Sequence, residues 1–261
     1  MGNVGLGGCI LSTESLFEVE ERDEITIIDV HSPARGLVLT TPTYMDQIWS
    51  HLHRVARKKQ RVLLMLYGKD LFAPARVDES WEDIVNTARS GNEMPPQILA
   101  LQSNTKKLIE YYKASRTLCI GAFSGAIDLD IFGLVASSHY RICTTDTMIE
   151  NRTIDRNTPP GSATVWFLTR MVGFARAAEI FLEQDSLTAN EARDLRLFNA
   201  VVPPEELRSF STEKAEYFAS KSPLALSTLV VALNHTHQPL KEYLDMVETE
   251  FPAVFKAYST W

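Results

Sequence analysis

The spacing of apolar residues predicts strands and helices that alternate through the first half of the chain. Residues 16–20 alternate between apolar and polar, and residues 24–30 form a β-branched run that ends at His31-Ser32-Pro33. Between residues 43 and 57, apolar side chains recur at helical spacing, which predicts an amphipathic helix. The run 62–67, bounded by Gly68, is apolar throughout and is typical of a strand buried on both faces. These segments predict a strand–helix–strand unit with a right-handed crossover.

The same alternation continues through the middle of the chain. A helix is predicted at 97–114, a buried strand at 117–123, a helix at 129–137 and a strand at 140–144. The remaining residues are mainly helical in pattern, with candidate helices at 165–168, 175–182, 189–195, 205–220, 223–234 and 240–258. We therefore predict an α/β core with a helical C-terminal part, and the absence of repeats or linkers favours one folding unit.

Composition narrows the classes of function. The chain has 26 Lys+Arg against 33 Asp+Glu, a formal net charge of −7, which disfavours a nucleic-acid partner. No apolar run reaches the ~20 residues needed to cross a bilayer, so no membrane partner is expected. The three cysteines are widely spaced and predict neither a disulfide framework nor a zinc site. These features predict a cytoplasmic protein without a metal.

Short motifs for nucleotide binding or serine hydrolysis do not occur in the sequence, but two longer stretches are specific. The first runs from IGAFSGA at 120–126 to SSHYRICTTDTMI at 137–149. The second begins with PGSA at 160–163 and continues through VGFARAAE at 172–179, LTANEA at 187–192 and LFNAVVP at 197–203. Together they resemble the crotonase family, also called the enoyl-CoA hydratase/isomerase superfamily. The likeness extends from about Phe17 to the C-terminal helix and is strongest over 173–203.

The resemblance implies a crotonase-like spiral of ββα units. We expect this spiral core over residues 1–200 and a helical oligomerisation region over 201–261 that builds a homotrimer or hexamer. It also implies acyl-thioester substrates, usually carried on coenzyme A, and no other cofactor. The shared chemistry of the family is an oxyanion hole of two backbone N–H groups, each typically worth ~2.7–4 kcal/mol to a developing enolate.

Both expected oxyanion donors fall where this chain departs from the family pattern. The first donor maps to Ala75, within Ala73-Pro74-Ala75-Arg76, where proline replaces the usual glycine. The second maps to Asp130, within Leu129-Asp130-Ile131, where a glycine triplet is usual. A carboxylate at Asp130 would oppose the charge of an enolate oxygen unless it were protonated or turned away.

The acid/base positions depart as well. The two glutamates of a family hydratase map to Gly133 and Thr153, neither of which is a general base near neutral pH. Hydration of an enoyl thioester is therefore not expected, and isomerisation lacks its usual proton carrier. Glu150, Asp155 and Arg156 flank Thr153 and could point inward, although solvated or oligomer-contact roles are the simpler interpretation.

Other charged residues near these motifs have two open interpretations. Asp128 and Asp130 lie at a predicted helix start, where the helix dipole favours carboxylates, and this role accounts for one of them. His139 takes the place of a family aspartate, and a structural hydrogen bond to the next strand is favoured over catalysis. Coenzyme A carries three phosphate groups, so Arg35 and Arg76 are the candidates for binding it.

Two hypotheses follow. In the first, the chain acts on an acyl thioester by non-hydratase chemistry, which includes decarboxylation, isomerisation and carbon–carbon hydrolysis. In the second, it is a catalytically inactive scaffold that retains the fold. The first is favoured, because families retain more active members than inactive ones. Convergence of the donors at Ala75 and Asp130 on one point beside an open pocket would support it, whereas a plugged pocket would support the scaffold.

Overall fold

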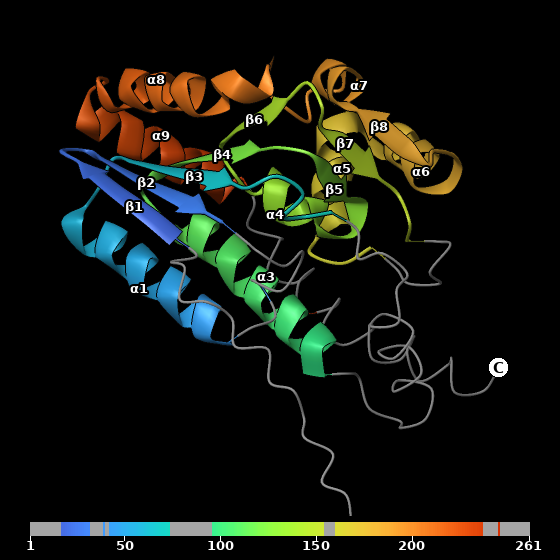
Figure 1. Cartoon of the computed structure of the whole chain (residues 1–261), viewed down its shortest axis with the longest axis horizontal. Helices are drawn as coiled ribbons and strands as arrows, with labels where there is room; N and C mark the ends of the chain where they lie inside the picture. Colours follow the sequence, from blue (N-terminus) through green and yellow to red (C-terminus); the bar gives the residue numbers. More distant parts are fainter. Residues whose placement is uncertain are drawn as a thin grey trace, which may run out of the picture.

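A computed structural model describes residues 17–31, 39, 42–73, 96–153, 160–236 and 245 of the chain. Its main sheet has six strands in the order β1-β2-β3-β4-β6-β9 (Figure 1). β1 and β2 form an antiparallel ribbon, and every later pairing in this sheet is parallel. The strands are β1 (Phe17–Arg22), β2 (Ile25–Val30), β3 (Val62–Tyr67), β4 (Leu118–Phe123), β6 (Tyr140–Thr144) and β9 (Ala200–Val202).

Helices cover both faces of this sheet, and the side chains of β3 alternate between them. Leu63 and Met65 belong to the core that includes apolar residues of α1 (Pro42–Lys58) and α3 (Pro96–Ala114). Leu64 and Leu66 belong to a second core with α8 (Leu207–Ala219) and α9 (Pro223–His235). Figure 1 shows α1 and α3 below the sheet and α8 above it. A strand with apolar residues at every position is stable here because both of its faces are buried.

A second, three-stranded sheet has the order β5-β7-β8 and was not predicted from the sequence. Its strands are β5 (Ala126–Asp128), β7 (Met148–Glu150) and β8 (Ser186–Thr188). Each has three residues, too short for alternation to be recognised. The helical elements that follow these strands or β9 are η2 (Leu129–Ile131), α4 (Phe132–Ala136), α5 (Thr164–Val172), α6 (Phe174–Glu183), α7 (Ala189–Asp194) and η3 (Pro204–Glu206).

The α/β class predicted from the sequence is confirmed, and most element boundaries agree within one to three residues. The segment predicted as one helix at 129–137 is a 3₁₀ turn followed by a short α-helix. The helix predicted at 240–258 lies outside the described residues except for Asp245. Cys119 and Cys143 are free and buried, and burial raises the pKa of each thiol to about 12, so they pack as small apolar side chains. Within the described ranges, no helix is long and apolar enough to cross a membrane.

Candidate functional site

The backbone N–H of Asp130, the second predicted oxyanion donor, is already bonded within the chain. Asp128 ends β5 and caps η2, and its Oδ1 accepts a hydrogen bond from Asp130 N at 3.0 Å. Asp128 is 6% exposed, so this carboxylate is held inside the protein. A donor that serves a neighbouring carboxylate does not stabilise a substrate oxyanion until that carboxylate moves away.

The side chain of Asp130 joins η2 to the turn that precedes α5. Its Oδ1 accepts a hydrogen bond from Gly161 N, and its backbone oxygen accepts one from Thr164 Oγ1 at 3.1 Å. The same Thr164 hydroxyl accepts from Gly133 N at 2.8 Å. Asp128 and Asp130 therefore both have structural roles, whereas the sequence accounted for only one of them.

Gly133, which the resemblance maps to one of the two hydratase glutamates, lies directly against another backbone segment. A Cβ added there would lie 1.7 Å from Ser162 O and 2.8 Å from Thr164 N. Ser162 and Ala163 have φ of 51° and 57°, so the contacting turn already lies in the left-handed region. The structure explains the glycine by close approach of α4 to this turn, and there is no room for a carboxylate-bearing side chain.

Thr153, at the second glutamate position, is 1% exposed. Its hydroxyl donates to Asn151 Oδ1 at 2.8 Å, and the Asn151 amide donates to the carbonyl oxygens of Ile180, Phe181 and Gln184 at 3.0–3.1 Å. Thr153 is thus placed beside a side chain that holds the C-terminal end of α6. Sequence reasoning missed Asn151, because no local pattern indicates three carbonyl partners about thirty residues away.

The other candidates divide into those that the structure places and those outside the described residues. Six of the residues named from the sequence lie outside the described residues: Arg35, Pro74, Ala75, Arg76, Asp155 and Arg156.

Two further candidates lie within the described residues and have partners. Glu150 Oε2 lies 3.5 Å from Arg152 Nη2 on the same segment, which agrees with the solvated interpretation. His139 Nδ1 accepts from Cys119 N at 3.0 Å, and its Nε2 lies 3.0 Å from Asn234 Oδ1. His139 thus has a structural role, but its ring bonds to β4, the preceding strand, and to α9 rather than to the next strand as expected.

Two half-buried cations, Lys113 and Arg141, lie near the starts of β4 and β6. Burial lowers the pKa of Lys113 to about 8 and that of Arg141 to about 10. Arg141 donates to Leu197 O and Ser138 O, both at 2.7 Å. Lys113 Nζ lies 5.6 Å from the ring centroid of Phe167, and no carboxylate in the described ranges pairs with it. A lysine in such surroundings is close to neutral at mildly alkaline pH.

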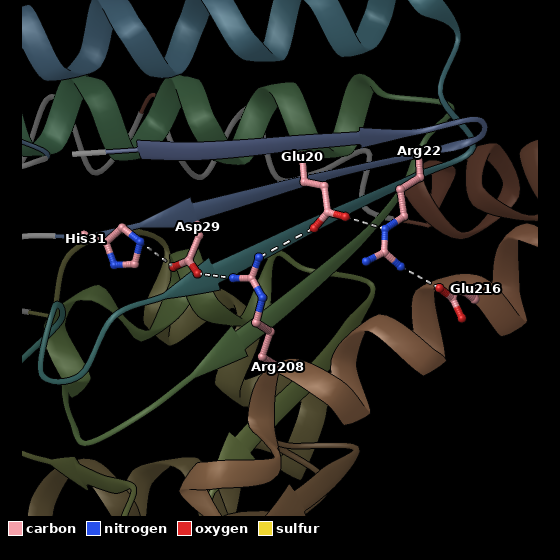
Figure 2. Close-up of polar contacts among 6 residues, drawn as sticks. All are labelled: Glu20, Arg22, Asp29, His31, Arg208 and Glu216. Carbon is pink, nitrogen blue, oxygen red and sulfur yellow. Dashed lines mark hydrogen bonds and ion pairs between the residues drawn. The ribbon is translucent and has the colours of Figure 1, made fainter. Parts of the chain in front are cut away.

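One group of side chains within the described ranges has the composition of a metal site. Glu18, Asp29 and His31 bring their ligand atoms within 4.8 Å of one another. However, Figure 2 shows the Arg208 guanidinium between Asp29 and Glu20, where it bonds to the former and lies 3.6 Å from the latter. Because a guanidinium already neutralises Asp29, we assign these residues to an ion-pair network that fastens the β1–β2 ribbon to α8.

Comparisons with known proteins agree with this architecture. The sequence model described as "Enoyl-CoA hydratase/isomerase" matches residues 89–259. The chain is 36% identical over 85 residues, 33% of its length and 31% of the relative's, to a probable mitochondrial enoyl-CoA hydratase of Dictyostelium discoideum. It is 22% identical over 197 residues, 75% of its length and 72% of the relative's, to methylmalonyl-CoA decarboxylase of Escherichia coli. The chain thus spans only about a third of the first of these relatives.

The fold also matches solved structures. An enoyl-CoA hydratase from Bacillus halodurans superposes with a TM-score of 0.79 at 15% identity, covering 94% of this chain and 97% of that one. This similarity confirms the predicted crotonase-like fold. Since the family model matches more than half of the residues of this chain, the chain belongs to the enoyl-CoA hydratase/isomerase family.

Proposed function

We propose that this chain binds an acyl thioester of coenzyme A at the family site and acts on it by a reaction other than hydration. The observation that carries the proposal is the contact of Gly133 with Ser162 O, which leaves no room for a catalytic glutamate. The relatives include a methylmalonyl-CoA decarboxylase, which supports a reaction other than hydration.

Decarboxylation of a malonyl-type thioester suits the residues best. The bond between the carboxylate carbon and the α-carbon breaks, CO₂ leaves, and the electron pair passes to the thioester as an enolate. The enolate then takes a proton at the α-carbon. No general base is required at positions 133 or 153, and the chief requirement is stabilisation of the enolate oxygen. Ala75 N–H and Asp130 N–H are the proposed donors, with Arg35 and Arg76 binding the phosphates of coenzyme A.

This mechanism requires Asp128 to rotate away from Asp130 N, because the two are bonded at 3.0 Å. The same bond favours the second candidate function, a catalytically inactive scaffold in which Asp128 permanently occupies the donor. A homotrimer or hexamer suits either function, and light scattering of the purified protein measures it.

Binding and turnover separate these functions. Isothermal titration with malonyl-CoA and crotonyl-CoA measures binding, and chromatography of the products measures turnover. The first function predicts binding of both, release of acetyl-CoA from malonyl-CoA, and no hydration of crotonyl-CoA. Binding without any turnover supports the scaffold, whereas hydration of crotonyl-CoA overturns the proposed chemistry. Absence of binding to either thioester refutes the thioester site.

Two variants of Asp128 test whether its hydrogen bond to Asp130 N limits turnover. Asp128→Asn keeps an oxygen that accepts from Asp130 N, whereas Asp128→Ala releases the N–H. If Asp128 restrains the enzyme, Asp128→Ala decarboxylates faster than Asp128→Asn at equal protein concentration. Equal rates in the two variants contradict a role for this hydrogen bond in turnover.

A further inference from the structure

A cavity of about 660 Å³ lies at the end of the main-sheet strands that is opposite to Asp130. The C-terminal ends of α1 and α3 and the first turns of α9 form its walls, close to where β3 and β4 begin. The Asp130 region instead follows the other end of β4. A six-residue strand is about 20 Å long, so the cavity is separate from the family site.

The charged groups that line this cavity are all positive. Lys59, Arg61 and Arg116 contribute, and no carboxylate does. Arg61 is partly neutralised, since its Nε lies 2.9 Å from Glu24 Oε2 and its Nη1 donates to Ala219 O at 3.1 Å. Lys59 and Arg116 have no ion pair within the part of the chain that the structure describes. In a chain of net charge −7, this concentration of positive charge favours an anionic ligand.

Gln60 adds an unsatisfied polar group to the same wall. The residue is 7% exposed and lines the cavity, and its backbone oxygen accepts from Thr117 Oγ1 at 2.8 Å. Its side-chain Oε1 is buried and has no hydrogen-bond partner within the described residues. Since this oxygen is inaccessible to solvent, it lies behind the cavity surface, and the exposed charges of Lys59 and Arg116 are the groups that meet a ligand.

The rest of the wall is mostly apolar, with Tyr111, Pro223 and Leu224, and also includes the hydroxyl residues Ser115, Thr117 and Ser227. Ser222 caps the thirteen-residue helix α9 here, so the positive end of the helix dipole adds to the potential of the basic side chains. The cavity volume is within the ~300–1,000 Å³ range of small-molecule sites.

We propose that this cavity binds a small phosphate monoester with a largely apolar body, of the kind represented by a nucleoside monophosphate. Lys59 and Arg116 bind the phosphate, because guanidinium and ammonium groups are its usual partners. Tyr111 and Leu224 contact the body of the ligand. The proposal does not depend on thioester chemistry at the family site.

Isothermal titration of the full chain with AMP tests this site, using inorganic phosphate and octanoate as separate arms. We expect one AMP per chain, with phosphate and octanoate each at least tenfold weaker. The double variant Lys59→Ala/Arg116→Ala is expected to bind AMP at least tenfold more weakly than wild type. Arg57→Ala/Lys107→Ala removes the same charge from exposed residues outside the cavity and is expected to bind like wild type.

A second variant keeps the test valid if the double variant does not fold. Ala114→Phe fills the cavity from an exposed position of α3 without a charge change, and it is expected to abolish AMP binding. Circular dichroism checks the fold of each variant. The proposal is overturned if AMP does not bind wild type at millimolar concentration, or if filling the cavity leaves binding unchanged. Equal affinity for phosphate and AMP indicates an anion site alone, and preference for octanoate indicates a carboxylate ligand, so either result overturns it too.

Discussion

Replacing Gly133 tests whether the missing glutamate reflects backbone packing. The Cβ of any other residue would lie 1.7 Å from Ser162 O, where ordinary contacts are 3.4–4 Å. The turn cannot easily yield, because Ser162 and Ala163 already adopt positive φ and Thr164 Oγ1 joins it to Gly133 N. Overpacking typically costs 1–3 kcal/mol, and contact with backbone belongs at the upper end, so we expect a loss of about 3 kcal/mol or more for Gly133→Ala.

Thermal unfolding measures this loss. For a chain of this size, about 3 kcal/mol corresponds to a decrease in Tm of roughly 6–12 °C. Gly133→Glu is expected to unfold at least as early and to gain no hydration of crotonyl-CoA. Gly173→Ala is the matched control: a Cβ there meets nothing within 4 Å, although φ is +80°. Because its ψ is 160°, Gly173 lies in a region essentially restricted to glycine, so that variant should lose about 1–3 kcal/mol from backbone strain alone, without overpacking. If Gly133→Ala is as stable as wild type, the packing argument is refuted.

Three further variants test the electrostatics and hydrogen bonds around the site. Lys113→Met should be more stable than wild type below pH 8, by up to about 3 kcal/mol, because burial lowers the pKa of Lys113 from 10.5 to about 8. Because the pKa of Lys113 is lower in the folded than in the unfolded chain, the stability gained by Lys113→Met should disappear as the pH rises from 8 to 10.5. A stability difference in urea unfolding that does not change with pH would show that the charge of Lys113 is not its origin. Asn151→Ala should lower the free energy of unfolding by about 2–4 kcal/mol, more than Thr153→Val does, because the Asn151 amide bonds to three carbonyl groups at the end of α6. Equal losses for the two variants in denaturant titrations would argue against that anchoring role. Asp130→Ala leaves Gly161 N without its side-chain acceptor and should lower the free energy of unfolding by about 1–3 kcal/mol in the same assay. An unchanged free energy of unfolding would show that this hydrogen bond contributes little to stability.

Local sequence patterns determined the elements that are long enough to show a period. The apolar run 62–67 identified a doubly buried strand, and the three- and four-residue spacing of 43–57 identified α1. Both assignments rest on the side chains of a single segment, which the sequence displays directly. The three-residue strands of the second sheet show no period, because their pairing depends on partners far along the chain.

The motifs also determined family and fold, because together they extend over a long part of the chain. They also predicted that Asp130, Gly133 and Thr153 stand where the family has a glycine and two glutamates. They did not indicate what those residues contact. Local spacing contains no information on the approach of residues 133 and 162, which lie on different elements.

Only the tertiary structure decided what the predicted site residues contact and whether a basic cavity is present. It places Asp128 Oδ1 on Asp130 N, Ser162 O against Gly133, and Asn151 on the end of α6. It also brings Lys59 and Arg116, which follow different helices, to one cavity. Hydrogen bonds and steric contacts act over about 3–4 Å, so they depend on where the folded chain brings distant segments together. The sequence determined the family and the replacements, and the fold determined their consequences.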